Sequence, residues 1–269
     1  MAHPASRLLA PWLAASLGIL APAHAGAPDD SRVRITILYD NTPGLAAARA
    51  AWGFSCLAEA HGKTVLFDAG GSPPLMRHNL SLLRIDTSKI DAVIFSHQHG
   101  DHTAGIPAVP VPPGTPAYIP EDFQPPKGLP PLSDLGLRPI AVTNSTEIFP
   151  GIRIGDTLHG PPPEISLAID SPEGLVLLTG CAHPGIVAIL KDLSQKAARP
   201  IHAVIGGFHL LKTPDADVRA IIAEFRKMGV RRVGATHCTG EPAIRLFREA
   251  YGADFIACGP GTVIILPDL

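Results

Sequence analysis

The chain has 269 residues and a net charge of −2, with 46% hydrophobic and 17% charged residues. This apolar content is enough for a folded core and excludes a disordered chain, while the near-neutral balance gives no electrostatic footprint for nucleic acid. Four scattered cysteines without a CxxC pair exclude a disulfide-built scaffold and a zinc knuckle, although an exported chain could still form one disulfide.

The first 25 residues are typical of an export signal. Arg7 is the one charged residue there, an apolar run follows over 8–21, and Ala23-His24-Ala25 has the small-x-small pattern of a cleavage site. The apolar run is too short to span a bilayer, which argues against the alternative of a retained anchor helix. We therefore expect residues 1–25 to be a signal peptide and residues 26–269 to form one domain, periplasmic or secreted and free of the membrane.

Short runs rich in β-branched residues, bounded by turn residues, predict strands in the first half of the chain. Helical spacing of apolar residues appears in the second half, with further strands between and after the helices. Strands and helices together predict a layered α/β domain. The expected strands are 33–39, 54–59, 64–67, 92–95, 140–143, 165–169, 175–179, 201–205, 232–236 and 262–266, and the expected helices are 184–196, 215–228 and 242–251.

Ten prolines between residues 106 and 132 restrict this stretch to loop or polyproline-like backbone, apart from a short strand at 117–119. The stretch is either a semi-rigid loop beside a functional site or a plain surface connector.

A dense cluster of polar residues follows the expected strand 92–95, in the segment FSHQHGDHTAG. His97 and His99 are two residues apart, so both imidazoles can converge on one point, and Asp101 and His102 can converge on a second. Imidazole is the commonest ligand of zinc-like ions, and carboxylates suit the same metals. Because four such groups without partners would be costly at a buried strand end, the cluster predicts a metal site.

The pattern from His97 to His102 resembles the HxHxDH signature of the metallo-β-lactamase superfamily. The resemblance implies an α/β fold, the metallo-β-lactamase-like four-layer αββα sandwich, with a site for two metal ions at one edge. The stretch LFDAGG, residues 66–71, is similar to an upstream element of the superfamily, in which the aspartate, here Asp68, supports the metal loop without binding metal.

Four further stretches, ILYDN from Ile37, LLTGCAHPGI from Leu177, IGGFHL from Ile205 and ATHCTG from Ala235, resemble one branch, the dihydropterin-ribofuranosylaminobenzene phosphate synthase-like metallohydrolases. This resemblance extends from about Val33 to the end of the chain. The reaction named for this branch belongs to the cytoplasm, so an exported chain is expected to share the fold and metal chemistry more than the substrate.

The resemblance implies two ligand sets. One ion would lie among His97, His99 and His183, and the other among Asp101, His102 and His237. Cys181 stands where the commoner pattern has an aspartate that bridges both ions. It either replaces that bridge as a thiolate, which would favour zinc, or is a small buried thiol next to the site.

His209 ends another expected strand, and it either donates a proton or binds substrate as a catalytic residue, or is a hydrogen-bonded structural histidine. His159 lies near the place of a missing motif but is displaced by one residue, so we assign it no role.

These features predict a metal-dependent hydrolase with two divalent ions, zinc first and manganese or iron as alternatives, which activate a water that Asp101 orients. The expected partner is a small anionic molecule, a phosphoester or related ester, because backbone N–H groups near residues 182–185 and 239–240 are expected to be free at helix starts. A lactonase or β-lactamase is the alternative enzyme. A metal-dependent binding protein without turnover is the alternative of a different class.

Overall fold

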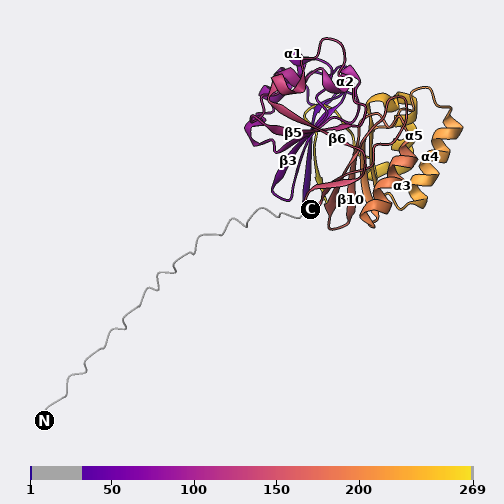
Figure 1. The fold of residues 1–269 in the computed structure, drawn as a ribbon. Helices are drawn as coiled ribbons and strands as arrows, with labels where there is room; N and C mark the ends of the chain where they lie inside the picture. Colours follow the sequence, from indigo (N-terminus) through magenta and orange to yellow (C-terminus); the bar gives the residue numbers. More distant parts are fainter. Residues whose placement is uncertain (2–31, 268–269) are drawn as a thin grey trace.

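Two sheets lie face to face in the computed structural model, and helices cover the outer face of each sheet (Figure 1). The structure describes Met1 and residues 32–267, so the expected signal peptide lies outside the described residues apart from Met1. The four layers confirm the expected αββα sandwich.

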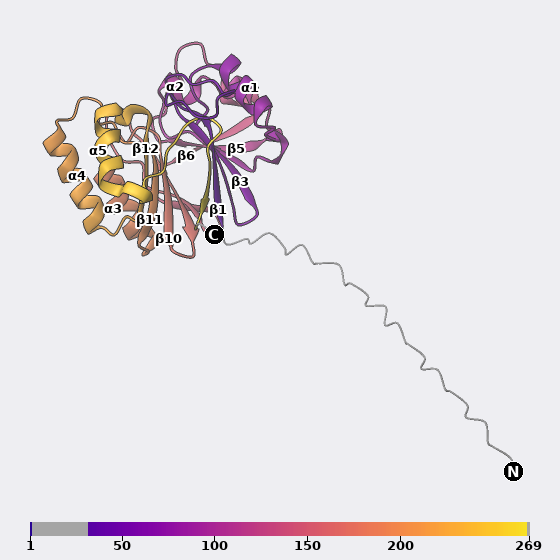
Figure 2. The same cartoon turned by 180° about the vertical axis from the view of Figure 1, so that it is seen from behind.

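The first sheet contains mainly strands from the N-terminal half of the chain. Its exception is the C-terminal strand, which returns to pair antiparallel with the first strand, with Val33 opposite Leu266 (Figure 2). In spatial order the strands are β13 (Val263–Leu266), β1 (Val33–Tyr39), β2 (Ser55–Ala60), β3 (Lys63–Phe67), β4 (Ala92–Ile94), β5 (Thr115–Pro120) and β6 (Leu137–Val142).

The second sheet follows in the chain and ends in three parallel strands, β10, β11 and β12. Its strands in spatial order are β12 (Arg232–Thr236), β11 (Ile201–Gly207), β10 (Gly174–Thr179), β9 (Leu167–Ser171), β8 (Ile152–Ile154) and β7 (Thr146–Phe149).

Three groups of buried apolar side chains hold the layers together. One lies between the sheets and joins, for example, Ile35 to Val176, while a second packs the first sheet against α1 and a third packs the second sheet against α3, α4 and α5. Burial of such side chains is the main favourable term in folding. The helices are α1 (Pro73–Leu82), α2 (Gly100–Thr103), α3 (Ile186–Ala197), α4 (Asp215–Lys227) and α5 (Glu241–Tyr251), and the 3₁₀ turns are η1 (Thr87–Lys89), η2 (Ile106–Ala108), η3 (Leu132–Leu135), η4 (His237–Thr239) and η5 (Gly252–Asp254).

Most expected elements are confirmed to within three residues, whereas α1, α2, β7 and β8 were not expected. The strand β6 begins three residues before the expected start, and it includes Pro139. It is the edge strand of its sheet, where a proline costs no ladder hydrogen bond. Within the described residues, no helix has the length and apolar character needed to cross a membrane. All four cysteines are buried free thiols, so none forms a disulfide.

Candidate metal centre

The expected site residues come together at one edge of the sandwich, where parallel strands of both sheets end. Side chains beyond the carboxyl ends of parallel strands meet at the same edge of a sheet, the usual place for a site in such folds. The helix α2 marks this edge in Figure 1, at the top where the two halves of the chain meet. Asp68 follows β3, His97 to His102 follow β4, Cys181 and His183 follow β10, His209 follows β11, and His237 follows β12.

A first group of imidazoles consists of His97, His99 and His183. The Nε2 atom of His97 lies 3.1 Å from Nδ1 of His99. The ring centroid of His183 lies 4.6 Å from that of His97 and 4.9 Å from that of His99. The structure therefore brings together the three histidines expected around one ion.

A second group consists of Asp101, His102 and His237. The Nε2 atoms of the two histidines are 3.2 Å apart, and Oδ2 of Asp101 lies 3.4 Å from Nε2 of His237 and 3.7 Å from Nε2 of His102. These three side chains also form a compact set, as expected.

Cys181 lies between the two groups. Its Sγ atom is 3.2 Å from Nε2 of His102. Its sulfur, with one ligand atom each from His97 and His183, forms a set in which all ligand atoms are within 4.8 Å of one another, and the same holds for Cys181, His102 and His237. One thiol thus belongs to both candidate ligand sets, the place that the bridging aspartate takes in the commoner superfamily pattern.

Asp68 supports the histidine loop from below. Its carboxylate accepts hydrogen bonds from the backbone N–H of Ser96 (2.7 Å), from the Ser96 hydroxyl (2.7 Å) and from Nδ1 of His102 (2.7 Å). Because the single hydroxyl hydrogen of Ser96 points to Asp68, its oxygen accepts from Nδ1 of His97 at 2.9 Å. This matches the supporting role that the resemblance implied for Asp68.

Glu164, to which the sequence analysis assigned no role, holds the segment after β10 in place. Its fully buried carboxylate accepts from the backbone N–H groups of Cys181 (3.0 Å), Ala182 (2.9 Å) and His183 (3.0 Å), and from Nδ1 of His183 (2.9 Å). Burial opposes ionisation, but these hydrogen bonds hold the pKa of Glu164 below its usual value. A buried carboxylate therefore fixes both a backbone turn and one imidazole of the site.

These outer contacts determine which ring nitrogens are free. Nδ1 of His102 donates to Asp68, and Nδ1 of His237 donates to Oδ1 of Asn41 at 2.7 Å. In the neutral rings, both Nε2 atoms then carry lone pairs that face each other at 3.2 Å. Two lone pairs at this distance repel unless a proton or a metal cation lies near them, and acceptors on the far nitrogen are the usual support of metal-binding histidines. The donor set therefore fits divalent metal ions.

The pKa shifts show which of these groups are ready to bind a metal ion and where the ion would have to displace a proton. Burial and the neighbouring imidazoles lower the pKa of His97 well below its usual range, so its ring is neutral. Burial opposes the charge on His102, but the Asp68 carboxylate raises its pKa to about 9. Burial also opposes ionisation of Asp101, yet His237 and His102 hold its pKa well below the usual range. The neighbouring Cys238 thiolate and burial raise the pKa of Cys181, so a thiolate at Cys181 requires a compensating cation.

Comparison with known proteins agrees with this geometry. A family model described as "Metallo-beta-lactamase superfamily" matches residues 53–228. The chain belongs to the metallo-beta-lactamase superfamily. Members of this superfamily usually bind divalent metals and are largely metal-dependent hydrolases.

Proteins similar to this chain differ in the activities that their names give. A 7,8-dihydropterin-6-methyl-4-(beta-D-ribofuranosyl)-aminobenzene-5'-phosphate synthase of Methanocaldococcus jannaschii is 28% identical over 247 residues, which cover 75% of this chain and 84% of the relative. A solved metal-dependent hydrolase of the beta-lactamase superfamily is 26% identical with a TM-score of 0.74, covering 86% and 98%. A diphosphatase of the PhnP family, 17% identical with a TM-score of 0.56 and coverage of 87% and 97%, shares the fold. The synthase supports the expected branch, and the metal-dependent hydrolase shows that similar chains include hydrolases as well.

His209 lies at the outer side of this superfamily site. Its ring centroid is 4.6 Å from that of His183, and its ligand atom, with Cys181 and Cys238, forms a third set within 4.8 Å. Burial opposes ionisation of Cys238, but hydrogen bonds with Cys181 and His209 lower its pKa well below the usual range, and the Cys238 thiolate in turn raises the pKa of His209. His209 is therefore an exposed imidazole beside the candidate metal ligands.

Two further predictions for the surroundings of the site have opposite outcomes. The prediction of free N–H groups at residues 182–185 is wrong, because the N–H groups of Ala182 and His183 donate to Glu164 and that of Gly185 donates to the Ala182 carbonyl. The proline-rich stretch does lie beside the histidine loop, where the N–H of Gln124 donates to Oε1 of Gln98 at 3.0 Å.

Two supporting residues, Glu164 and Asn41, were missed from the sequence. Glu164 stands directly before the buried run 165–169, and a charge at such a boundary is the signal that could have found it.

Proposed function

We propose that this chain is an exported metal-dependent hydrolase that uses two divalent ions and cleaves a phosphoester or another anionic ester. The observation that carries the proposal is the position of Cys181, whose sulfur is shared by the His97–His183 set and the His102–His237 set. A shared ligand atom between two sets of donors is what a two-ion centre requires.

The residues that would hold the ions are the seven expected from the sequence. His97, His99 and His183 would hold one, Asp101, His102 and His237 the other, and Cys181 would bridge them. When bound, such ions supply a water of lowered pKa and stabilise negative charge that develops on the substrate. A thiolate among the ligands favours zinc over manganese or iron.

The chain's own groups have distinct tasks in this reaction. The Asp101 carboxylate, ionised at neutral pH, accepts a hydrogen bond from the attacking water and orients it. A ring nitrogen of His209 holds a proton and transfers it to the oxygen of the leaving group, because the pKa of this exposed imidazole is raised. Asp68 and Glu164 each hold the Nδ1 proton of one ligand histidine, so that Nε2 stays free.

An anionic substrate is supported by two observations besides the cationic centre. Lys212 lies at the mouth of the cavity next to His209. Two relatives act on or make phosphate compounds by name, a diphosphatase and a phosphate synthase. With export to the periplasm or beyond, the substrate would differ from that of the synthase.

The test is elemental analysis of the purified full chain together with a screen of phosphoesters, lactones and β-lactams. We expect about two zinc ions per chain and turnover of phosphoesters. Preferred turnover of a lactone or β-lactam would replace the proposed substrate class by the alternative enzyme class. Full metal content without turnover of any of the three would favour a binding protein.

A further inference from the structure

A cavity of about 310 Å³ opens directly beside the candidate metal centre. Its volume lies at the lower end of the range of small-molecule sites. It is lined by residues from the loop between β1 and β2, the loop between β11 and α4, and the turn η4. The lining residues are Trp52, His209, Leu211, Lys212, Thr213 and Cys238.

Two large apolar side chains in this cavity are half exposed. Trp52 is 50% exposed and Leu211 is 49% exposed. In the part of the chain that the structure describes, only Met1, Leu45 and Val263 are comparable, so two of the five such side chains face one small cavity. Covering exposed apolar surface inside a concave site with a ligand is favourable, so these two side chains indicate a surface that binds an apolar group.

The cavity is continuous with the reacting groups. The indole ring of Trp52 lies 4.8 Å from the imidazole of His237, and the ring of His209 lies 4.6 Å from that of His183. A group bound in the cavity would therefore lie next to His209, the proposed proton donor. An ester whose anionic group lies at the metal centre would place its leaving group in this adjoining cavity.

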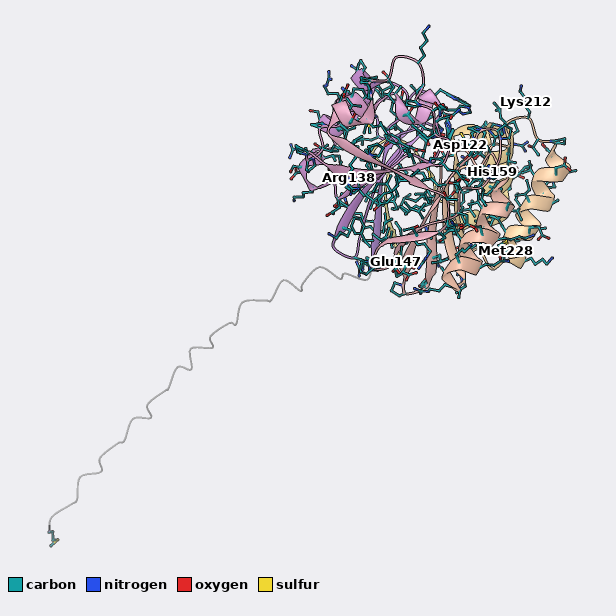
Figure 3. All side chains as sticks on the ribbon, in the orientation of Figure 1. Asp122, Arg138, Glu147, His159, Lys212 and Met228 are labelled. Carbon is teal, nitrogen blue, oxygen red and sulfur yellow. The ribbon has the colours of Figure 1, made fainter. Side chains whose placement is uncertain are left out.

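The charge at the cavity mouth limits the occupant further. Lys212 is exposed on the loop before α4, and Figure 3 shows it at the upper end of the molecule, the end that carries α2 in Figure 1. An ammonium group there attracts an anionic substrate to the mouth, while the indole face of Trp52 suits a flat ring better than a flexible chain.

We infer that this cavity is a specificity pocket that binds an aromatic leaving group of an anionic ester, with Trp52 and Leu211 as its apolar wall. The inference rests on the proposed function. In an aryl phosphoester, the bond from phosphorus to the aryl oxygen would break as a bond from phosphorus to the water oxygen forms. The aryl oxygen would take up the proton that the attacking water gives up, so the products are a phenol and phosphate.

Binding can be tested without turnover. The chain has two tryptophans, and Trp12 lies in the expected signal peptide, so Trp52 is the one indole emitter of the protein that begins at Gly26, or of the Trp12→Phe variant if residues 1–25 are retained. We expect phenylphosphonate, which cannot be hydrolysed at its carbon–phosphorus bond, to change this emission saturably and to bind about tenfold more tightly than methylphosphonate. Equal affinity for the two, or tighter binding of hexylphosphonate than of phenylphosphonate, would overturn the aromatic assignment.

Kinetics with phenyl phosphate supply the second test. Trp52→Ala should raise KM about tenfold, which corresponds to about 1.4 kcal/mol and is within the range of aromatic pairs, while Trp52→Phe should keep most of the affinity. Leu211→Ala should raise KM about threefold. The matched control is Leu45→Ala, since Leu45 is 50% exposed and does not line the cavity.

The two proposals fail in different ways. Hydrolysis of phenyl phosphate with a KM that Trp52→Ala changes less than twofold would overturn the pocket and leave the hydrolase. A Trp52-dependent preference for phenylphosphonate without phosphoester turnover would support the pocket and refute the proposed reaction.

Discussion

Replacing Glu164 by glutamine tests whether one buried carboxylate organises the metal centre. The side chain keeps its shape, but one of the two oxygens becomes an NH₂ group. In the unchanged protein, each carboxylate oxygen accepts two hydrogen bonds. One oxygen accepts from the backbone N–H groups of Cys181 and Ala182, and the other accepts from the backbone N–H and Nδ1 of His183. Whichever way the amide turns, two buried donors then face another donor.

The cost follows from those two donors. An unsatisfied buried hydrogen-bonding group costs about 1–3 kcal/mol, so Glu164→Gln should destabilise the fold by about 2–6 kcal/mol. At about 2–4 °C per kcal/mol for a domain of this size, the melting temperature should fall by at least about 4 °C. His183 also loses its tautomer control, and loss of such a support typically lowers metal affinity about 10–100-fold.

The assay is thermal unfolding of the chelated protein, followed by a zinc titration of the same sample. Glu147→Gln is the matched control, because Glu147 is 49% exposed, accepts from Gly151 and Arg153, and lies at the lower end of the molecule in Figure 3, opposite Lys212. The control should change stability by less than about 0.5 kcal/mol. If Glu164→Gln matched the control in melting temperature and zinc affinity, the organising role of Glu164 would be wrong.

Four further outcomes are expected. His99→Ala should lose metal and activity together, whereas His159→Ala, at an exposed position, should keep both; full metal content in the first variant by elemental analysis would remove His99 from the ligands. Cys181→Ser should lose mainly one of two ions, and unchanged zinc stoichiometry would favour a plain buried thiol. In the chelated protein, the folded pKa of His102 is about 9 against about 6.5 unfolded, so its stabilisation is complete below pH 6.5 and is lost as pH rises through 9. Denaturant unfolding should show up to about 3 kcal/mol less stability at pH 9.5 than at pH 6, and a flat profile would contradict this assignment. The exported protein should begin at Gly26, and an intact mass that still includes Met1 would refute cleavage.

The secondary structure and the grouping of the histidines after β4 could be predicted from the sequence because both depend on local patterns, whereas the αββα arrangement was implied by the family resemblance. The strand 33–39 was expected at the observed bounds, since its β-branched residues and flanking turn residues are adjacent in the chain. Likewise, the histidine cluster is contiguous from His97 to His102, so no long-range information is needed to see it.

The supporting contacts could not be predicted in the same way. Glu164 accepts hydrogen bonds from residues that lie 17 to 19 positions later in the chain, and Asn41 accepts one from His237, which lies 196 positions later. Only the folded sandwich brings these partners together. The prediction of free N–H groups after β10 failed for the same reason. The local sequence indicates a helix start but not the distant Glu164 carboxylate that accepts from those N–H groups.

The arrangement of Cys181 also explains why the site depends on both sheets. His97 and His102 follow β4 of the first sheet, whereas Cys181 and His237 follow β10 and β12 of the second. Neither sheet alone carries either of the two proposed ligand sets, since the set of His97, Cys181 and His183 and the set of His102, Cys181 and His237 each take one imidazole from the first sheet and one from the second. A cation held at this edge would link the two sheets directly, and because it binds the packed state and not the separated one, its binding free energy adds to the stability of the sandwich.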